Sequence, residues 1–507
     1  MRRFFFFGAI LILSVFSLSA QHLKREMRAV WIATVANIDW PSKPGLTPTK
    51  QRTEMREMLD KLQDNNINTI IVQVRPTADS FYPSDLEPWS MYLSGKQGER
   101  PNPYYDPLEF IVEEAHRRCM DVHVWINPYR VTNTLSQIRN LDKNHLYYKN
   151  RNLFVEYGGK YYFDPGLDET REFLNKVVED ILLRYDIDGV HLDDYFYPYP
   201  EGNKDFPDED TFRKNPRGFA PNQKADWRRN NVNMVISEIH QTIKNLKPWV
   251  QFGVSPFGVW RNDYNDPRGS ATRAGVQNYD DLYADILKWL KDGDIDYVVP
   301  QLYWEIGKKV ADYEVLVKWW SENTFGRNLY TGLYASGLIE NKTQAWKNGN
   351  ELARQLKMNQ QYPNVEGAVY FSAKTFLQNP RGLLDTLSNN YYKYPALQPV
   401  PKNDFGEASA QPQNIRILKD GKDSFLLWDD VVEDGGCKVM YYVVYAFKGK
   451  EVGDINNPEN IIALTTENCL DLHKVDRKLK GRTTFVVTAV NRFKYESTPT
   501  HGVSRKL

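Results

Sequence analysis

The feature that most constrains the fold of this chain is an alternation of strand and helix patterns between Arg28 and about residue 389. Short runs rich in β-branched and aromatic residues alternate with segments whose apolar residues recur at helical spacing. Eight such rounds predict a closed (β/α)8 TIM barrel. The predicted strands are RAVWIATV from 28, TIIVQV from 69, VHVWI from 122, IDGVHL from 187, VQFGVS from 250, IDYVVPQL from 295, NLYTGLYA from 328 and EGAVYFS from 366.

An open doubly wound sheet is the alternative fold, and it would carry a Gly-rich phosphate-binding turn after an early strand. No such turn is visible in the sequence. The residues in excess of a minimal barrel follow the third, fourth and fifth predicted strands. Because the loops after barrel strands open on one face, we expect these segments to form the walls of a substrate cleft.

The composition changes after the barrel, which we place at residues 24–393. Residues 394–410 are proline-bearing and predict a linker. Residues 411–507 contain short alternating strands such as SFLLWD, VMYYVVYAF and RTTFVVTAV, which predict a small all-β sandwich of the immunoglobulin or fibronectin kind. The order of these features resembles a fibronectin type III module, and we expect it to be a spacer or a docking domain.

The first 20 residues have the pattern of an export signal peptide. Arg2 and Arg3 give a basic start, Phe4–Phe16 an apolar centre and Ser17–Ala20 the small residues near a cleavage site. The apolar run is too short for a comfortable membrane span, so we expect no stable span. The sequence therefore predicts an exported protein, periplasmic or extracellular.

Charge and cysteine content exclude several functional classes. The formal net charge is zero, from 65 basic and 65 acidic residues, so nothing steers the chain towards nucleic acid. Three cysteines do not make a disulfide framework, and whether Cys437 and Cys469 pair is left open. No Cys or His cluster has the spacing of a zinc site, and we expect neither a metal nor a cofactor. The oligomeric state is not indicated.

Chemistry is predicted at the end of the fourth strand, in DIDGVHLDDYFYPYP from residue 186. Side chains alternate along a strand, so Asp193 shares a face with Gly189 and His191 and points at the barrel axis. Active sites of such barrels lie at the carboxyl ends of the strands. Two carboxylates beside aromatic rings fit cleavage of a glycosidic bond, in a polysaccharide substrate. Asp193 is the expected nucleophile or base; the alternative is that one Asp caps a helix or pairs with an arginine.

The proton donor is left open between three acids. Asp194 reaches the cleft only if the chain leaves extended geometry at that point. Glu305 has the same parity as Gln301 and Tyr303 and would cross the mouth from the sixth strand. Asp79, in the loop after the second strand, is the third candidate. Whether the reaction retains or inverts configuration depends on the distance between the carboxyl groups, which the sequence does not supply.

The predicted strand ends and loops also collect candidates for sugar binding. Tryptophans in loops favour stacking on sugars, whereas Arg75 and Arg130 could either hold structural carboxylates or bind an acidic sugar substituent. An inward-facing His191 could equally be a core residue. The set is Trp40, Arg75, Asp79, Asn127, Tyr129, Arg130, His191, Tyr195, Trp260, Gln301, Tyr303, Trp304 and Tyr334.

Several segments are similar to the bacterial glycosyl-hydrolase-like family ten, among them RAVWIATVANIDWP, VQVRPTADSFYPSDLEPWS, GVHLDDYFYP, FGVSPFGVWRN and VVPQLYW. The resemblance implies a TIM barrel with glycoside hydrolase activity in the cell envelope. It suggests the glycan strands of peptidoglycan as substrate, possibly after removal of their peptides. Another extracellular polysaccharide is the alternative substrate.

GVHLD is also similar to the strand-four motif of α-amylase-like barrels, with Asp193 at the nucleophile. His191 stands where those enzymes carry Arg, and Ser255 and Pro256 replace their Glu after strand five. These departures keep a second class open, a non-catalytic carbohydrate-binding or scaffold protein. An amidase or peptidase is a third class, but no Cys and His pairing or zinc constellation is predicted at the mouth.

Overall fold

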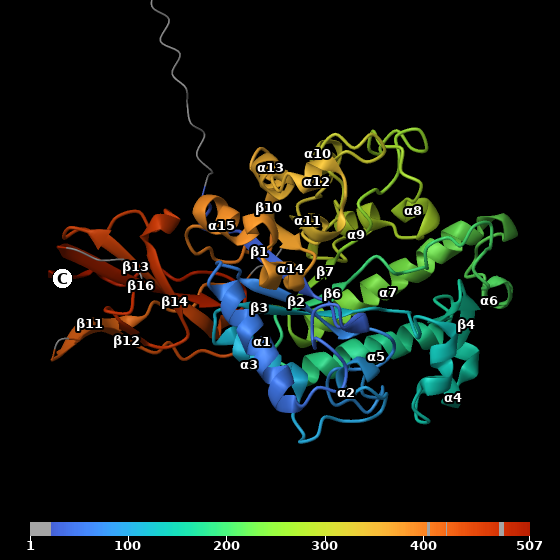
Figure 1. Ribbon diagram of the computed structural model, residues 1–507, viewed down its shortest axis with the longest axis horizontal. Coiled ribbons are helices and arrows are strands. Elements are labelled where there is room, and N and C mark those ends of the chain that lie inside the picture. Colours follow the sequence, from blue (N-terminus) through green and yellow to red (C-terminus); the bar gives the residue numbers. More distant parts are fainter. Residues whose placement is uncertain (1–21, 403–405, 422, 476–480, 507) are drawn as a thin grey trace, which may run out of the picture.

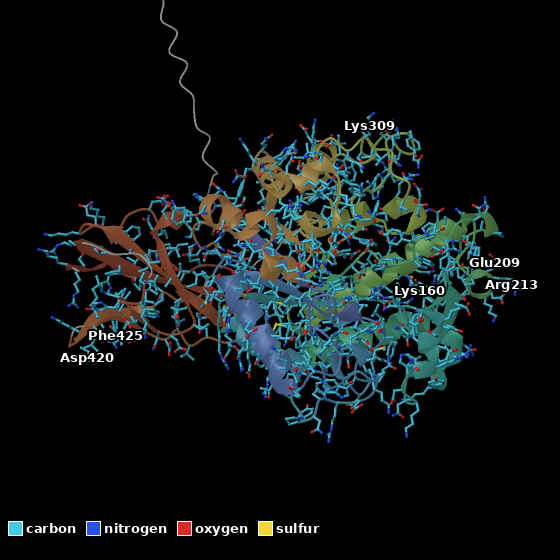
Figure 2. All side chains as sticks on the ribbon, viewed as in Figure 1. Lys160, Glu209, Arg213, Lys309, Asp420 and Phe425 are labelled. Atoms are coloured by element: carbon cyan, nitrogen blue, oxygen red, sulfur yellow. The ribbon has the colours of Figure 1, made fainter. Side chains whose placement is uncertain are left out.

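The computed structural model describes residues 22–402, 406–421, 423–475 and 481–506 (Figure 1). The predicted signal peptide at residues 1–20 lies outside the described residues. None of the described helices has both the length and the apolar character that a bilayer crossing requires. Charged side chains such as Glu209, Arg213 and Lys309 project outward from the surface (Figure 2).

Eight parallel strands close into a barrel in the order β1-β10-β9-β8-β7-β6-β3-β2. All eight match predicted strands, although β8 is only two residues long. The closed barrel is therefore confirmed. The strands are β1 (Met27–Ile32), β2 (Thr69–Arg75), β3 (Asp121–Ile126), β6 (Gly189–Leu192), β7 (Gln251–Val254), β8 (Tyr297–Val298), β9 (Asn328–Leu333) and β10 (Val365–Tyr370).

Helices surround the barrel and several begin at capping residues. The Thr47 side chain accepts a hydrogen bond from the Lys50 amide, and Asp106 caps the next long helix in the same way. The longer helices are α1 (Pro48–Gln63), α3 (Pro107–His116), α5 (Asp168–Arg184), α7 (Lys224–Leu246), α9 (Ile286–Asp292), α10 (Tyr313–Glu322) and α13 (Glu351–Asn359). The shorter ones are α2 (Met91–Ser94), α4 (Leu146–Lys149), α6 (Glu209–Lys214), α8 (Asn278–Asp281), α11 (Gly337–Glu340), α12 (Gln344–Lys347), α14 (Ala373–Gln378) and α15 (Leu383–Thr386).

Each barrel strand divides its side chains between two apolar layers, as the period of two requires. In β1, Val30 and Ile32 belong to the layer between strands and helices, whereas Ala29 and Trp31 belong to the barrel interior. The interior is tightly filled. A Cβ added at Gly253 would lie 2.1 Å from the ring of Tyr297. Glycine is therefore required there by the ring that crosses the barrel axis.

Strands β11 to β17 form an antiparallel sandwich of two sheets, which confirms the predicted fold class. One sheet has the order β11-β12-β15 and the other β14-β13-β16-β17. Cys437 and Cys469 are both free thiols. The strands are β11 (Gln413–Asp420), β12 (Asp423–Asp429), β13 (Val439–Lys448), β14 (Ile461–Thr465), β15 (Cys469–Asp471), β16 (Arg482–Asn491) and β17 (Val503–Lys506).

The sandwich packs against the end of the barrel where the strands begin. Arg492 of the sandwich lies 2.5 Å from Asp186, three residues before β6. The predicted linker is also held in place, because Leu397 is buried and its amide donates to the Lys24 carbonyl at 2.8 Å. Tyr441 of β13 donates to Gln398 at 2.5 Å. The sandwich and the barrel therefore share buried contacts, and the role of the sandwich as a spacer or a docking domain stays a prediction.

Candidate active site

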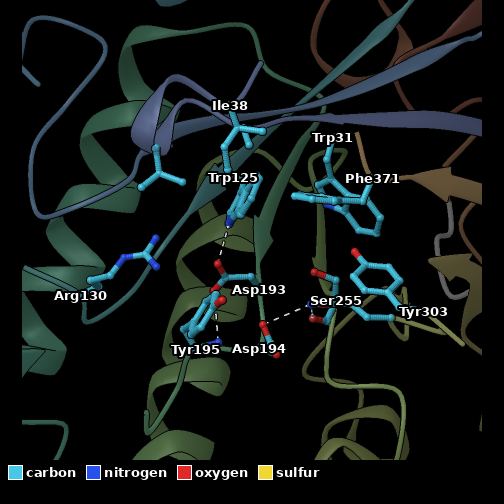
Figure 3. Close-up of a pocket in the computed structure, with 13 residues that line it drawn as sticks. Trp31, Ile38, Trp125, Arg130, Asp193, Asp194, Tyr195, Ser255, Tyr303 and Phe371 are labelled. Carbon is cyan, nitrogen blue, oxygen red and sulfur yellow. Dashed lines mark hydrogen bonds between the residues drawn. The ribbon is translucent and has the colours of Figure 1, made fainter. Parts of the chain in front are cut away.

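A pocket of about 240 Å³ opens at the carboxyl ends of the barrel strands, opposite the sandwich. Its floor holds both carboxyl groups that follow β6 (Figure 3). Five further barrel strands contribute to the wall, directly or through residues of the loops that follow them. The lining residues are Trp31, Ala33, Val35, Ile38, Trp125, Arg130, Asp193, Asp194, Tyr195, Ser255, Gln301, Tyr303 and Phe371.

Asp193 is held by donors from β3 and from its own loop. The Trp125 indole Nε1–H donates to Asp193 Oδ2 at 3.0 Å, and Asn127 Nδ2 lies 3.4 Å from the same oxygen. The Tyr195 amide donates to Oδ1 at 3.3 Å. Asn127 therefore supports the acid from behind and does not itself line the pocket.

Asp194 enters the same pocket because β6 ends at Leu192 and the chain leaves extended geometry before the second acid. Departure from extended geometry was the condition under which Asp194 was expected to reach the cleft. The Tyr199 hydroxyl donates to one carboxyl oxygen, and Gln301 Nε2 donates to the other at 3.2 Å. Both donors stabilise an ionised carboxylate at this position.

Burial and mutual repulsion raise the pKa of this pair of carboxyl groups. Desolvation raises the pKa of Asp193 to about 7, with the charge of Asp194 adding to the rise and Arg130 opposing it. Burial also raises the pKa of Asp194, while the hydrogen bonds from Tyr199 and Gln301 lower it. With its pKa near 7, the Asp193 carboxyl group therefore carries a proton for part of the time at neutral pH.

Aromatic rings and one cation face each other across the pair. The ring of Phe371 lies 6.4 Å from Trp31 and 6.1 Å from Tyr303, which forms one wall. On the other side the Arg130 guanidinium lies 5.1 Å over the Tyr195 ring (Figure 3). Such a wall suits the apolar face of a sugar, because aromatic side chains can bury a large apolar area of a ligand in a defined orientation.

Two predicted binding residues lie one layer behind the lining. Tyr334 stacks on Tyr303 at 5.4 Å and donates to Glu340, so it supports the wall. His191 is fully buried below the pocket, where its Nε2 lies 2.9 Å from the Ser255 hydroxyl. Burial lowers the pKa of His191 well below its usual range, so it is a neutral core residue. The alternative of a core histidine is the correct one.

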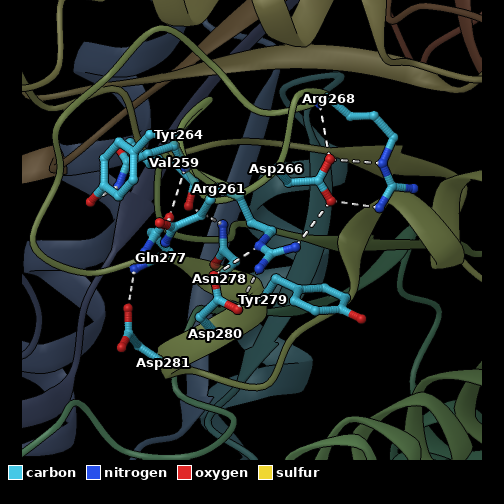
Figure 4. A network of polar contacts seen from close by, with 12 residues as sticks. Val259, Arg261, Tyr264, Asp266, Arg268, Gln277, Asn278, Tyr279, Asp280 and Asp281 are labelled. Atoms are coloured by element: carbon cyan, nitrogen blue, oxygen red, sulfur yellow. Dashed lines mark hydrogen bonds and ion pairs between the residues drawn. The ribbon is translucent and has the colours of Figure 1, made fainter.

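The loop tryptophans were the wrong choice for sugar stacking. Trp40 is fully buried and donates to the Gln51 carbonyl at 2.9 Å. Trp260 is 1% exposed and stacks on Trp319 at 5.9 Å. The segment after it is held by Arg261, which bridges Asp266 and Asp280 (Figure 4). Long loops that pack on the barrel bury their large rings in the contact.

Four other candidates also lie outside the pocket. Arg75 is fully buried and bonds both oxygens of Glu87 at 2.7 and 2.5 Å, so its role is a structural ion pair. Asp79 is buried against Thr77 and Gln97. Tyr129 is 1% exposed in the core between strands and helices. Trp304 packs edge-on against Phe257.

Glu305 is not placed to donate a proton in this pocket. Its carboxylate accepts from the Trp346 indole at 3.2 Å and lies 3.5 Å from Lys308. It does not line the cavity. Parity along the strand predicted an inward direction, and Gln301 and Tyr303 do line the pocket, but the chain bends at Trp304 and Glu305 no longer follows the alternation. Of the three donor candidates, Asp194 alone lines the pocket.

The tryptophans that do line the site, Trp31 and Trp125, were not among the predicted binding residues. Trp31 and Trp125 lie within β1 and β3, not in loops. Both point into the barrel, and Trp125 has the same parity as the inward-facing His123. That parity was the available signal. Ser255, noted only as the substitute for a missing Glu, and Phe371 also line the pocket.

A closed parallel barrel with two interacting carboxyl groups in an aromatic pocket at its strand ends has the design of a glycoside hydrolase-like barrel. The chain belongs to the glycosyl hydrolase-like 10 family, whose family model matches residues 26–348. The predicted family is therefore confirmed. Among the described residues, no three His, Cys, Asp or Glu side chains gather as metal ligands would.

Relatives cover most of the chain. Glycosyl hydrolase YngK of Bacillus subtilis (strain 168) is 44% identical over 448 residues, which are 88% of this chain and 87% of that protein. Glycosyl hydrolase DigH of Escherichia coli (strain K12) is 40% identical over 385 residues, 72% of this chain and 86% of that protein. A solved structure of the PgaB (BpsB) glycoside hydrolase domain from Bordetella bronchiseptica has a TM-score of 0.48 at 11% identity, covering 72% of this chain and 99% of that domain.

Proposed function

We propose that this protein is an exported glycoside hydrolase that cleaves O-glycosidic bonds of a polysaccharide through Asp193 and Asp194. The observation that carries the proposal is the buried carboxyl pair in an aromatic pocket, which holds a proton near neutral pH. Glycosidic cleavage needs one group that protonates the leaving oxygen and one that stabilises the positive charge developing on the sugar. The pair can supply both groups from one strand end.

The hydrogen bonds to the two acids favour a different catalytic role for each of them. Tyr199 and Gln301 donate to Asp194, so Asp194 ionises first and stabilises or attacks the sugar cation. The charge on Asp194 then keeps the proton on Asp193, which acts as the general acid. This assignment reverses the expectation from sequence, in which Asp193 was the nucleophile or base.

The proposed substrate is the glycan strand of peptidoglycan. The family resemblance supports it, together with the predicted export signal and the aromatic wall of Trp31, Phe371 and Tyr303. The sandwich is proposed to be a fibronectin type III-like module. Recovery of the mature chain outside the cytoplasm, with its first residue near Gln21, would support the proposed location; retention of residues 1–20 in the cytoplasm would contradict it.

Release of reducing ends from purified glycan strands tests the activity. We expect release by the wild type and a loss of about 100-fold or more with Asp193→Asn or Asp194→Asn, as removal of an acid catalyst or charge stabiliser costs. Asp85→Asn is the matched control, since Asp85 has a 98% exposed side chain. Binding of strands without any release by the wild type would favour the non-catalytic alternative.

A substrate with an activated leaving group separates the two roles. The dinitrophenolate group of a dinitrophenyl glycoside departs without being protonated. The Asp193→Asn variant should therefore retain most of the wild-type activity on such a substrate. Asp194→Asn should remain impaired, because the sugar cation still needs stabilisation. The opposite pattern would restore the original assignment of Asp193 as nucleophile or base.

A further inference from the structure

Arg130 is a buried cation that the proposed acid chemistry does not use. It is 9% exposed and lines the pocket opposite the aromatic wall (Figure 3). Its backbone is fixed, since the Arg130 amide donates to Asn127 Oδ1 at 2.9 Å and the residue bridges to Tyr162. The side chain is therefore presented from a rigid base.

The guanidinium is only partly satisfied by the protein. Nε and Nη2 both donate to the Pro76 carbonyl at 3.3 Å, and the plane lies over the Tyr195 ring. Among the described residues, no carboxylate lies within 4.0 Å of Arg130 and no acceptor bonds its Nη1. Arg75, from the neighbouring strand end, instead has both its Nε and Nη2 on Glu87.

Buried charges in proteins are normally paired with an opposite charge and hydrogen-bonded. The Arg130 guanidinium has neither a carboxylate partner nor an acceptor for Nη1 among the described residues. The two acids on the pocket floor do not fill this role. Asp193 and Asp194 have hydrogen-bond donors of their own, and neither carboxyl group lies within 4.0 Å of Arg130. The Arg130 guanidinium is directed toward the pocket from the side opposite Phe371 and Tyr303 (Figure 3).

We propose that Arg130 binds a carboxylate carried by the sugar in the pocket and so selects acidic glycans. The proposal rests on the proposed function, because it takes the pocket to be a sugar site. A planar guanidinium matches a carboxylate in a two-point hydrogen bond, which a hydroxyl cannot equal. The carboxylate could belong to a uronic acid or to a carboxylated ether such as the lactyl group of glycan strands.

Paired substrates that differ only in charge test the proposal. One pair is glycan strands with free lactyl carboxylates and the same strands converted to methylamides. The other is a uronic acid oligosaccharide and its carboxyl-reduced form. For Arg130→Gln we expect kcat/KM on the preferred acidic substrate to fall about 10- to 100-fold further than on its neutral partner, mainly through KM.

The comparison within a pair removes the indirect effect of Arg130 on the acids, because both partners meet the same Asp193 and Asp194. Arg130→Lys should recover part of the preference, since it keeps the charge and loses the planar fork. Arg151→Gln is the control, because Arg151 is exposed, lies over Tyr147 and does not line the pocket. Equal losses on acidic and neutral partners would overturn the proposal.

Binding to the inactive Asp193→Asn protein keeps the two proposals distinguishable. Calorimetry of acidic and neutral oligosaccharides with Asp193→Asn, and with Asp193→Asn combined with Arg130→Gln, reports carboxylate recognition without turnover. Binding that depends on charge and on Arg130 supports the inference even if the wild type cleaves nothing. Cleavage by the wild type, together with binding that depends on neither the substrate charge nor Arg130, would support the proposed function and contradict the inference about Arg130.

Discussion

Lys494 Nζ lies 2.7 Å from Asp121 Oδ1, where a turn of the sandwich meets the first residue of β3. The same nitrogen lies 3.2 Å from Asp188, one residue before β6, and Lys494 is 1% exposed. Asp188 also bonds His116 at 2.8 Å. One buried lysine therefore ties the sandwich to two barrel strands, at the end of the barrel away from the carboxyl pair.

We expect Lys494→Met to destabilise the protein by about 3 to 5 kcal/mol, because it leaves Asp121 and Asp188 buried without their cation. The midpoint of thermal unfolding measures the effect. Lys474→Met is the control: Lys474 is 85% exposed at its pair with Asp471, and such pairs contribute at most about 1 kcal/mol. Equal midpoints for both variants would show that the sandwich does not stabilise the barrel.

Gly253→Ala should destabilise the barrel by about 1 to 3 kcal/mol or more, because its Cβ would lie 2.1 Å from the Tyr297 ring. Tyr297 cannot move aside freely, since its hydroxyl bonds His123 at 2.7 Å. Gly275→Ala is the matched control, with nothing within 4 Å of the added Cβ. Chemical denaturation compares the two. A tolerated Gly253→Ala would mean that the interior packs less tightly than described.

Asp193→Asn should change stability in a pH-dependent way. The folded pKa of Asp193 is raised to about 7 from 3.8, so the folded state binds its proton more tightly than the unfolded state. Wild-type stability from this group is present below pH 3.8 and is lost as pH rises to about 7. The melting temperature of the variant should therefore gain on the wild type between pH 5 and pH 8. A constant difference across this range would contradict the raised pKa.

Tyr199→Phe should move the acidic limb of the kcat/KM profile to higher pH. The Tyr199 hydroxyl donates to Asp194 and lowers its pKa, and a hydrogen bond to a charged group contributes about 1.5 to 3 kcal/mol, or one to two pH units. Tyr104→Phe, at a 57% exposed tyrosine, should leave the profile in place. An unmoved acidic limb in Tyr199→Phe would remove Asp194 as the group that ionises first.

The barrel, the sandwich and the position of the acids could all be predicted from local sequence patterns. Strand and helix periodicities are local, and eight repeats of them leave few closed arrangements. The run Gly189 to Leu192 is apolar and ends at two acids, so Asp193 and Asp194 could be placed at a strand end from residue order alone. The rule that residues beyond the carboxyl ends of barrel strands face the site also predicted four other lining residues, Tyr195, Gln301, Tyr303 and Arg130.

Which aromatic and charged side chains face the pocket could not be predicted in this way, because it depends on how distant segments pack together. Trp40 and Trp260 are buried because their loops fold back onto the barrel, whereas Trp31 and Trp125 reach the cavity from strands. Arg75, the last residue of β2, has a carboxylate partner, whereas Arg130, in the loop after β3, has none among the described residues. Burial and pairing depend on residues distant in sequence, and local pattern carries no information about them.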